Sequence, residues 1–176
     1  MNTTTLKLKK NNHNAGFTMV EIMAAISVLL FGIVAIYGVF SNVVTLTYGT
    51  SARFTAAYLA QEGMETIRNI RDNNFISGAT WSAGLLGSPC STGCMADYKT
   101  KTSSQLVVYN DALLGLNSDG FYSYDSGSVP TIFKRKITIS SVQGTTNILN
   151  VDVMVFWNYN GQSFNFDTSE YLYNWY

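Results

Sequence analysis

The first half of the sequence contains a long segment without charge, and this segment constrains the fold more than any other feature. From Ile22 to Ala52 the chain has no charged residue. About 20 apolar residues in a helix cross the roughly 30 Å hydrocarbon core of a bilayer, so Ile22 to about Val44 is long enough to span a membrane with some tilt. A secretory signal peptide has an apolar stretch of only about 7–15 residues followed by a small-residue cleavage site. The segment is therefore predicted to be a transmembrane helix.

The charges on either side of this segment predict its orientation. Three lysines precede it, and only Arg53 lies soon after it; the lysines are Lys7, Lys9 and Lys10. Because basic flanks stay in the cytoplasm, we expect a cytoplasmic N-terminus and an extracytoplasmic C-terminal part. The span is also rich in small residues, which are tolerated in a simple anchor and also allow helices in lipid to pack closely. Composition alone leaves both interpretations open.

A single carboxylate, Glu21, stands at the head of the apolar run. A charged side chain at the bilayer centre costs roughly 2.5–3.5 kcal/mol, and ionisable groups inside a membrane usually have a function. One interpretation is a first-turn glutamate that the helix dipole stabilises at the level of the lipid headgroups. The other is a role in assembly.

The residues around Glu21 resemble the prepilin cleavage and methylation motif of type IV pilins and of the pseudopilins of type II secretion. Gly16-Phe17-Thr18-Met19-Val20-Glu21 follows a short basic leader and precedes the charge-free stretch. The resemblance implies that a bacterial membrane peptidase cuts between Gly16 and Phe17 and that the new Phe17 amino group is N-methylated. It also implies that Thr18 and Glu21 take part in assembly, with the carboxylate facing the amino-terminal charge of a neighbouring subunit. Because a buried charge is tolerable only when paired, Glu21 would fix the register between subunits.

The helical pattern continues beyond the apolar segment. Apolar residues recur there at spacings of three and four, which indicates an amphipathic helix; they are Ala57, Ala60, Met64, Ile67 and Ile70. The opposite face is charged or polar and is expected to be solvated, with Arg68 in reach of both Glu65 and Asp72. We expect one helix from about Thr18 to Asn73, its first half in lipid and its second half on a globular domain.

The C-terminal part is predicted to be a loop region followed by an antiparallel sheet. Residues 76–104 are rich in Gly, Ser and Thr, which is typical of loops. The runs "TIFKRKITIS" and "ILNVDVMVFW" alternate with period two, and Asn160-Gly161 predicts a hairpin after the second run. The charges of Lys134-Arg135-Lys136 are expected to be exposed on the first strand. The expected fold class is α+β, with the apolar face of the sheet packed on the long helix.

Two cysteines, Cys90 and Cys94, lie in the predicted loop. On the outer side of a membrane, where disulfides persist, this spacing favours a local disulfide. Free thiols, a redox pair and metal binding are the alternatives, but a redox pair more usually has two intervening residues, and a metal would need two further soft ligands. We expect no metal and no cofactor.

The composition argues against several classes of function. Formal net charge is zero and only 12% of residues are charged, whereas nucleic-acid binding needs an excess of Lys and Arg on one face. The one histidine, His13, lies outside any cluster, so a histidine-based triad or zinc site has no partners. No set of nucleophile and base is found elsewhere, and we expect a protein that is not an enzyme.

The predicted organisation has four parts: a leader peptide (1–16), a transmembrane and assembly helix (17–45), its amphipathic continuation (46–75), and an extracytoplasmic loop region and sheet (76–176). The expected function is that of a structural subunit, a minor pilin or pseudopilin, in a type IV pilus or type II secretion-like filament. Its partners would be the prepilin peptidase and methyltransferase, other pilin subunits, the assembly platform and ATPase, and membrane lipid before assembly. After assembly it would lie in a pilus or in a periplasmic or cell-surface filament. The alternative is a single-pass membrane-anchored protein that binds a ligand outside the cytoplasm.

Overall fold

A computed structural model describes residues 16–175 apart from 88, 144 and 146. The predicted leader, except Gly16, lies outside the described residues. The chain divides into two compact units, Met1–Leu46 and Thr47–Tyr176.

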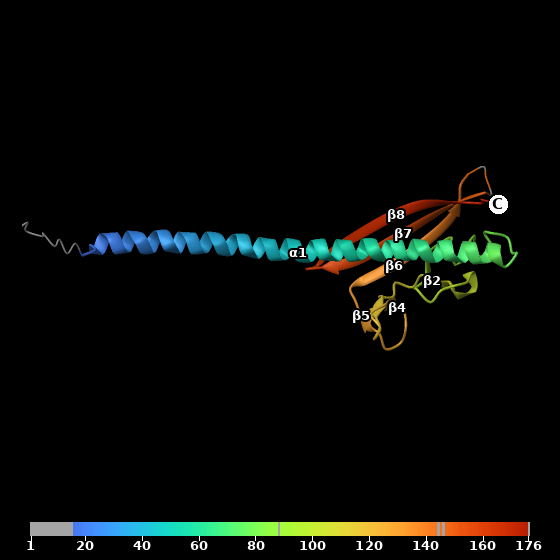
Figure 1. Ribbon diagram of the computed structural model, residues 1–176, viewed down its shortest axis with the longest axis horizontal. Coiled ribbons are helices and arrows are strands. Elements are labelled where there is room, and N and C mark those ends of the chain that lie inside the picture. The colour runs from blue at the N-terminus through green and yellow to red at the C-terminus, as the bar shows by residue number, and fades with distance from the viewer. Residues whose placement is uncertain (1–15, 88, 144, 146, 176) are drawn as a thin grey trace, which may run out of the picture. The chain divides into compact units, whose positions relative to one another are not determined.

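The long helix α1 (Met19–Ile76) has a capping side chain at its start and a glycine in the left-handed conformation just after its end (Figure 1). At its start, the Thr18 hydroxyl accepts a hydrogen bond from the Glu21 backbone N–H at 3.3 Å, which satisfies one of the helix's free donors. At its end, Gly78 has a φ of +74°, the left-handed conformation with which many helices close and which glycine adopts without strain. The helix continues slightly beyond the expected end at Asn73. By length and composition it is able to cross a membrane.

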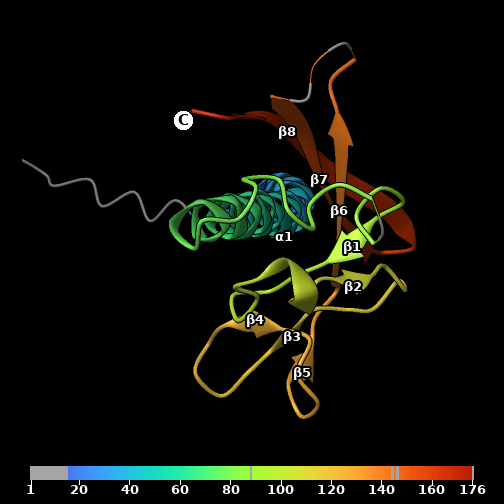
Figure 2. The same cartoon turned by 90° about the vertical axis from the view of Figure 1, so that its right-hand side faces the viewer.

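The second unit contains two antiparallel sheets. The larger has the order β2-β1-β6-β7-β8, and the smaller has the order β4-β3-β5. The strand bounds are β1 (Cys94–Met95), β2 (Val107–Val108), β3 (Gly115–Leu116), β4 (Tyr122–Ser123), β5 (Val129–Pro130), β6 (Phe133–Ser141), β7 (Ile148–Tyr159) and β8 (Gln162–Tyr173), with a 3₁₀ turn at Ser103–Gln105. Figure 2 shows α1 against one face of the larger sheet, with the smaller sheet as a separate element of the unit.

The β7–β8 hairpin turns at Asn160-Gly161, as its sequence predicts. Both residues have positive φ, 50° and 75°, which is the conformation of a two-residue type I′ turn. From this turn, β8 pairs with β7 along its whole length, from Tyr159↔Gln162 to Ile148↔Tyr173. The strand that follows the turn is therefore as long as β7 and extends from Gln162 to Tyr173.

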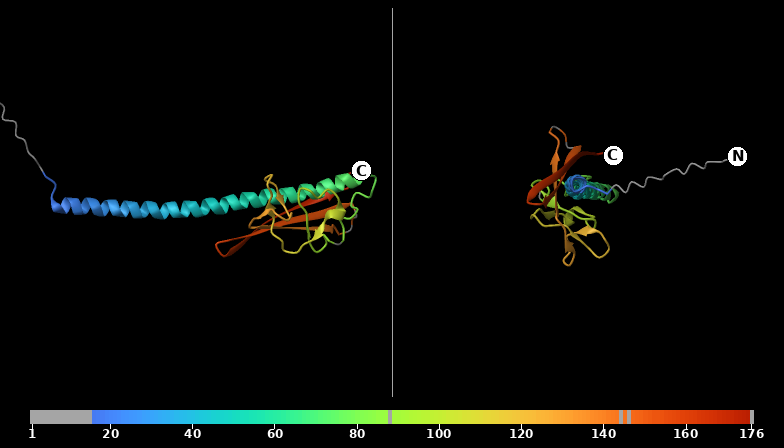
Figure 3. Two further views of the ribbon diagram at one scale, coloured as in Figure 1. Left: turned by 90° about the horizontal axis from the view of Figure 1, so that it is seen from below. Right: turned by 90° about the vertical axis from the view of Figure 1, so that its left-hand side faces the viewer.

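The core forms between the second half of α1 and the sheet, as Figure 3 shows from two further sides. The predicted stripe is buried at Ala60, Met64, Ile67 and Ile70 and only half-buried at Ala57; the helix also buries Ala56 and Leu59. From the sheet, alternate residues are buried, among them Phe133, Ile137, Ile139, Val151, Val153, Val155 and Trp157. The α+β fold class is confirmed.

Arg135 corrects one expectation, because its charge is not exposed. Period two along β6 puts residues 133, 135, 137 and 139 on the face toward α1, and Arg135 is 0% exposed. Lys134 and Lys136 lie on the opposite face and are half-buried. Of the three basic residues, only Arg135 lies inside the core, and the two lysines on either side of it point away from the core.

Candidate functional site

The N-terminal motif combines an extended exposed segment with a helix start. Gly16, Phe17 and Thr18 precede α1 without regular structure, and the Phe17 side chain is 79% exposed. No atom lies within 4 Å of the position that a Cβ on Gly16 would occupy. The described part of the chain therefore does not cover the peptide bond between Gly16 and Phe17, as a protease substrate requires.

Glu21 lies in the first turn of α1 with its side chain exposed. None of the ion pairs formed by residues 16–175 involves it. The helix N-terminus carries a partial positive charge that favours an acidic side chain in this turn. The carboxylate thus has a favourable helix position and, among the described residues, no cation paired with it.

The apolar part of α1 presents its large side chains to solvent. The large hydrophobic side chains from Met19 to Leu46 are exposed, among them Leu29 at 61% and Phe31 at 78%. Such a surface in water is far larger than the apolar patches of ordinary soluble proteins. It requires lipid or other helices around it.

Comparison with known proteins identifies the N-terminal motif. The model for the prokaryotic N-terminal methylation motif matches residues 11–37, which include Gly16 to Glu21 and the start of the apolar run. The N-terminal segment of the chain therefore carries the motif of type IV pilin-like proteins. No curated protein and no solved structure matches it. This motif points to a structural subunit, and the motif together with the apolar helix indicates membrane anchoring before assembly.

The cysteines form a disulfide in the second unit. Cys90 and Cys94 are joined with a Cα–Cα distance of 4.6 Å, and both are 0% exposed. Each is also held to β6 through its backbone: Ile139 N–H donates to the Cys90 carbonyl at 3.0 Å, and Cys94 pairs with Ile137. The disulfide therefore closes a small loop, and the backbone pairing of its two cysteines fastens this loop to β6, the central strand of the larger sheet.

The exposed face of α1 carries ion pairs that differ in part from the expected ones. Arg68 pairs with Glu65, as predicted, and also with both oxygens of Glu170 on β8 at 2.6 Å. Asp72 pairs with its neighbour Arg71 at 2.8 Å rather than with Arg68, because the Arg68 guanidinium is turned toward β8. The hydrogen bond to Glu170 is the main cause that raises the pKa of Arg68.

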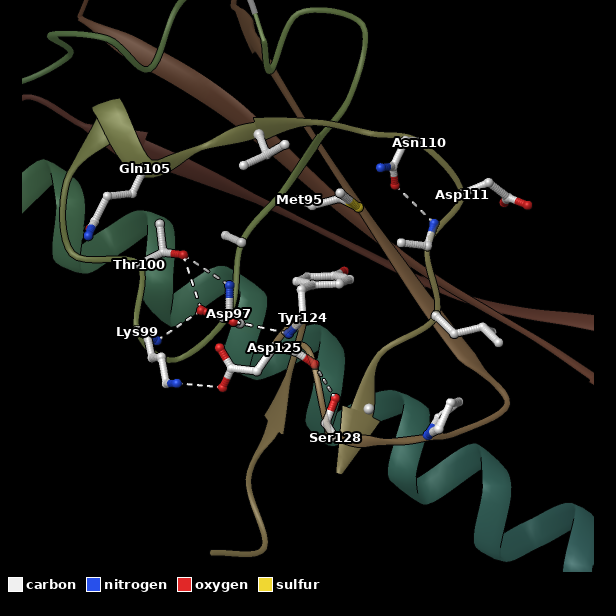
Figure 4. Close-up of a pocket in the computed structure, with 16 residues that line it drawn as sticks. Met95, Asp97, Lys99, Thr100, Gln105, Asn110, Asp111, Tyr124, Asp125 and Ser128 are labelled. Carbon is white, nitrogen blue, oxygen red and sulfur yellow. Dashed lines mark hydrogen bonds and ion pairs between the residues drawn. The ribbon is translucent and has the colours of Figure 1, made fainter. Parts of the chain in front are cut away.

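A cavity of about 840 Å³ lies beside the loop after β1 and the smaller sheet (Figure 4). Its most buried carboxylate is Asp97, which accepts hydrogen bonds from the backbone N–H groups of Lys99 at 3.0 Å and Tyr124 at 3.2 Å and from the Thr100 hydroxyl at 3.4 Å. Asp125 pairs with the Lys99 ammonium, and this contact lowers the pKa of Asp125. These carboxylates are occupied in holding loops together, and the described residues contain no group of three His, Cys, Asp or Glu that could hold a metal.

The buried Arg135 is a polar centre that was not expected. Its guanidinium donates to the Leu59 carbonyl at 2.7 Å, to the Ala96 carbonyl at 2.5 Å and to Glu62 at 3.1 Å. It thus joins α1, the loop beyond β1, and β6. Its Nε has no hydrogen-bond partner among the described atoms. The alternation of β6 already places residue 135 among the core positions, which is the signal that could have revealed it.

Proposed function

We propose that this chain is a minor pilin or pseudopilin that is cut between Gly16 and Phe17, N-methylated at Phe17, and assembled into a helical filament. The exposed apolar surface of α1 beside an exposed first-turn carboxylate carries this proposal. Van der Waals packing of neighbouring helices would replace lipid around the apolar side chains. Small residues, such as Gly32 and Gly38, would let the helices approach closely.

Glu21 sets the stagger between subunits in this proposal. It lies four residues after Phe17 and two residues after Met19, where α1 begins, so it is close to the new amino terminus. An amino-terminal charge of a neighbouring subunit at this height pairs with the carboxylate, whereas a subunit at another height leaves a charge unpaired in a low dielectric, at a cost of several kcal/mol. The ion pair therefore favours one register over others that pack equally well.

The remaining assignments follow the same proposal. The N-terminus is cytoplasmic, residues 17–45 form the transmembrane and assembly helix, 46–75 its amphipathic continuation, and 76–176 the extracytoplasmic part. The buried disulfide supports an oxidising location for that part. The partners are a prepilin peptidase and methyltransferase, other pilin subunits, and an assembly platform with its ATPase.

Mass spectrometry of the chain extracted from membranes tests the processing step. A polypeptide that starts at N-methylated Phe17 is expected. A chain that still starts at Met1, or one cut after Ser41, would contradict the proposal. An intact Met1 would favour instead a membrane-anchored protein that binds a ligand, with the cavity of about 840 Å³ as its binding site.

A matched pair of substitutions tests the role of Glu21. Glu21→Gln should be processed normally but be depleted from filaments sheared off the cell, because the amide cannot pair with an amino-terminal charge. Glu65→Gln changes the same group further along α1, where the Glu65 side chain is 61% exposed, and should leave incorporation intact. Normal incorporation of the Glu21→Gln chain would refute the register role.

A further inference from the structure

The turn between β7 and β8 exposes a chemically reactive dipeptide. Asn160-Gly161 is the one asparagine–glycine pair in the sequence, and it lies at the end of the hairpin that is remote from the C-terminus (Figure 1). Both residues are exposed to solvent. Asparagine is a thermolabile residue, because the backbone nitrogen of the following residue can attack its side-chain amide. A glycine in the following position favours the attack, since it has no Cβ beside the nitrogen.

The attacking nitrogen of this dipeptide is free in the folded turn. In a two-residue turn the cross-strand pair that closes the hairpin is Tyr159 with Gln162, so the N–H of Gly161 takes no part in the ladder. Among the described residues, none accepts a hydrogen bond from this N–H, and none bonds to the Asn160 side-chain amide. No described atom lies within 4 Å of the position that a Cβ on Gly161 would occupy. Neither reacting group is therefore held away from the other by a contact.

A second turn, at Asp119-Gly120, has a similar sequence and is also exposed. An aspartate before glycine undergoes the same ring closure, with loss of water instead of ammonia. In this turn, however, the Gly120 N–H donates to the Asn117 backbone carbonyl at 3.1 Å. The Asn117 side-chain carbonyl also accepts the backbone N–H groups of Asp119 and Phe121 at 3.0 and 2.9 Å. Of the two candidate turns in the sequence, the structure thus leaves the glycine nitrogen free only at Gly161.

We propose that Asn160 is a site of spontaneous deamidation and isoaspartate formation in the folded chain. The Gly161 backbone nitrogen gives up its proton to a solvent base and forms a bond to Cγ of Asn160. The Cγ–Nδ2 bond breaks, and the side-chain nitrogen takes up a proton and leaves as ammonia. Water then opens the resulting succinimide ring at one of its two carbonyl carbons, which gives aspartate or isoaspartate. The net reaction consumes one water and releases one ammonia, and it needs no oxidant, reductant or enzyme.

Isoaspartate changes the backbone of the turn as well as its charge. Its main chain passes through Cβ, which adds one atom between Tyr159 and Gln162. The length of a hairpin turn fixes the register of its strands, so the added atom disturbs the pairing that begins there. The rings of Trp157 and Phe164, two pairs further along the ladder, are stacked with their centroids 5.7 Å apart, and Trp157 is 4% exposed. Conversion of Asn160 is therefore expected to loosen this end of the core.

Two matched turns in one chain test the site. The Asp119→Asn variant of the full-length chain has two asparagine–glycine pairs, one with a free glycine nitrogen and one with a hydrogen-bonded nitrogen. The variant is incubated in detergent micelles at mildly alkaline pH, with and without urea. Mass spectrometry of its peptides then follows the exchange of the amide NH₂ group for a carboxyl OH group at positions 160 and 119.

The rate at each position in the folded chain is divided by the rate at the same position in urea, so that the effect of the neighbouring sequence cancels. An ordinary hydrogen bond corresponds to about a fivefold change in rate. The ratio of folded to urea rates should therefore be about fivefold or more higher at position 160 than at position 119. Equal ratios, or conversion of Asn160 in urea alone, would overturn the proposal.

A second measurement follows the consequence for the core. After incubation without urea, the unsubstituted chain should unfold at a lower urea concentration, as tryptophan fluorescence reports. The Asn160→Gly variant keeps a sequence that suits this turn, glycine–glycine, and has no side chain to cyclise, so its midpoint should not change. A converted chain with an unchanged midpoint would overturn the expected loosening of the hairpin. These readouts depend neither on a cut after Gly16 nor on assembly, so their failure is distinct from failure of the proposed function.

Discussion

Replacing Arg135 by alanine tests whether the buried guanidinium holds the extracytoplasmic unit together. The change removes the donors to the Leu59 and Ala96 carbonyls at 2.7 and 2.5 Å and to Glu62 at 3.1 Å. Leaving the Leu59 and Ala96 carbonyls without their buried donor costs about 1–3 kcal/mol, and the cavity left by truncating a large buried side chain to alanine brings the expected loss to about 3–5 kcal/mol. Arg135→Met keeps the length of the side chain, and Glu62, whose side chain is 33% exposed, regains water. We therefore expect a smaller loss for methionine, about 1–3 kcal/mol, chiefly from the unpaired Ala96 carbonyl.

Urea unfolding of the full-length chain in detergent micelles measures both changes. Trp81 and Trp157 are 8% and 4% exposed, so their fluorescence reports the opening of the core. With a slope of about 2 kcal/mol per molar urea, the alanine variant should unfold at a midpoint roughly 1.5–2.5 M lower. An alanine variant with an unchanged midpoint would refute the reasoning. A methionine variant as unstable as the alanine variant would show that the charge, not the packing of the side chain, dominates.

Two further predictions follow from contacts of the same unit. Gly63→Ala should destabilise the second unit by about 1–3 kcal/mol, because the new Cβ would lie 3.0 Å from Arg135 Cδ. The control is Gly49→Ala, where no described atom lies within 4 Å of the new Cβ. This control should be neutral or stabilising in the same urea titration. The pKa of Tyr109 is raised to about 12 by burial and by its hydrogen bond to Asp111. An unfolded tyrosine titrates near pH 10, so the folded state holds the Tyr109 phenolic proton more tightly than the unfolded state does. The stability that this proton contributes to the folded state is present below about pH 10 and is lost as pH rises toward 12. Ultraviolet titration should show the Tyr109 step moving toward pH 10 in Asp111→Asn; an unmoved step would contradict the assignment.

The parts of this fold that depend on local pattern were predictable from sequence. The charge-free run and the stripe through Met64 and Ile67 indicate the long helix, and Asn160-Gly161 indicates the hairpin, because helix and turn preferences act over a few residues. The two-residue strands of the smaller sheet are too short to show any alternation. They are held by backbone pairing with segments elsewhere in the chain.

The unexpected polar contacts have a common cause. Arg135 bonds to carbonyls 76 and 39 residues away in sequence, and the partner of Arg68 on β8 is 102 residues away. A basic residue in a strand is ordinarily a solvated one, and only the packing of α1 on β6 supplies the acceptors that make burial tolerable. Sequence spacing carries no information on such distant partners. The motif at the N-terminus was predictable because all its residues are adjacent in the chain.

The position at which α1 begins has a consequence for the proposed processing. Thr18 caps the helix and Met19 is its first residue, so a cut after Gly16 leaves only Phe17 and Thr18 ahead of it. The new terminal amine then lies only two residues from the first helical residue, so its distance from Glu21 is set by the first turn of α1 rather than by a flexible segment. A subunit built in this way presents its amine and its carboxylate to neighbouring subunits at a defined separation.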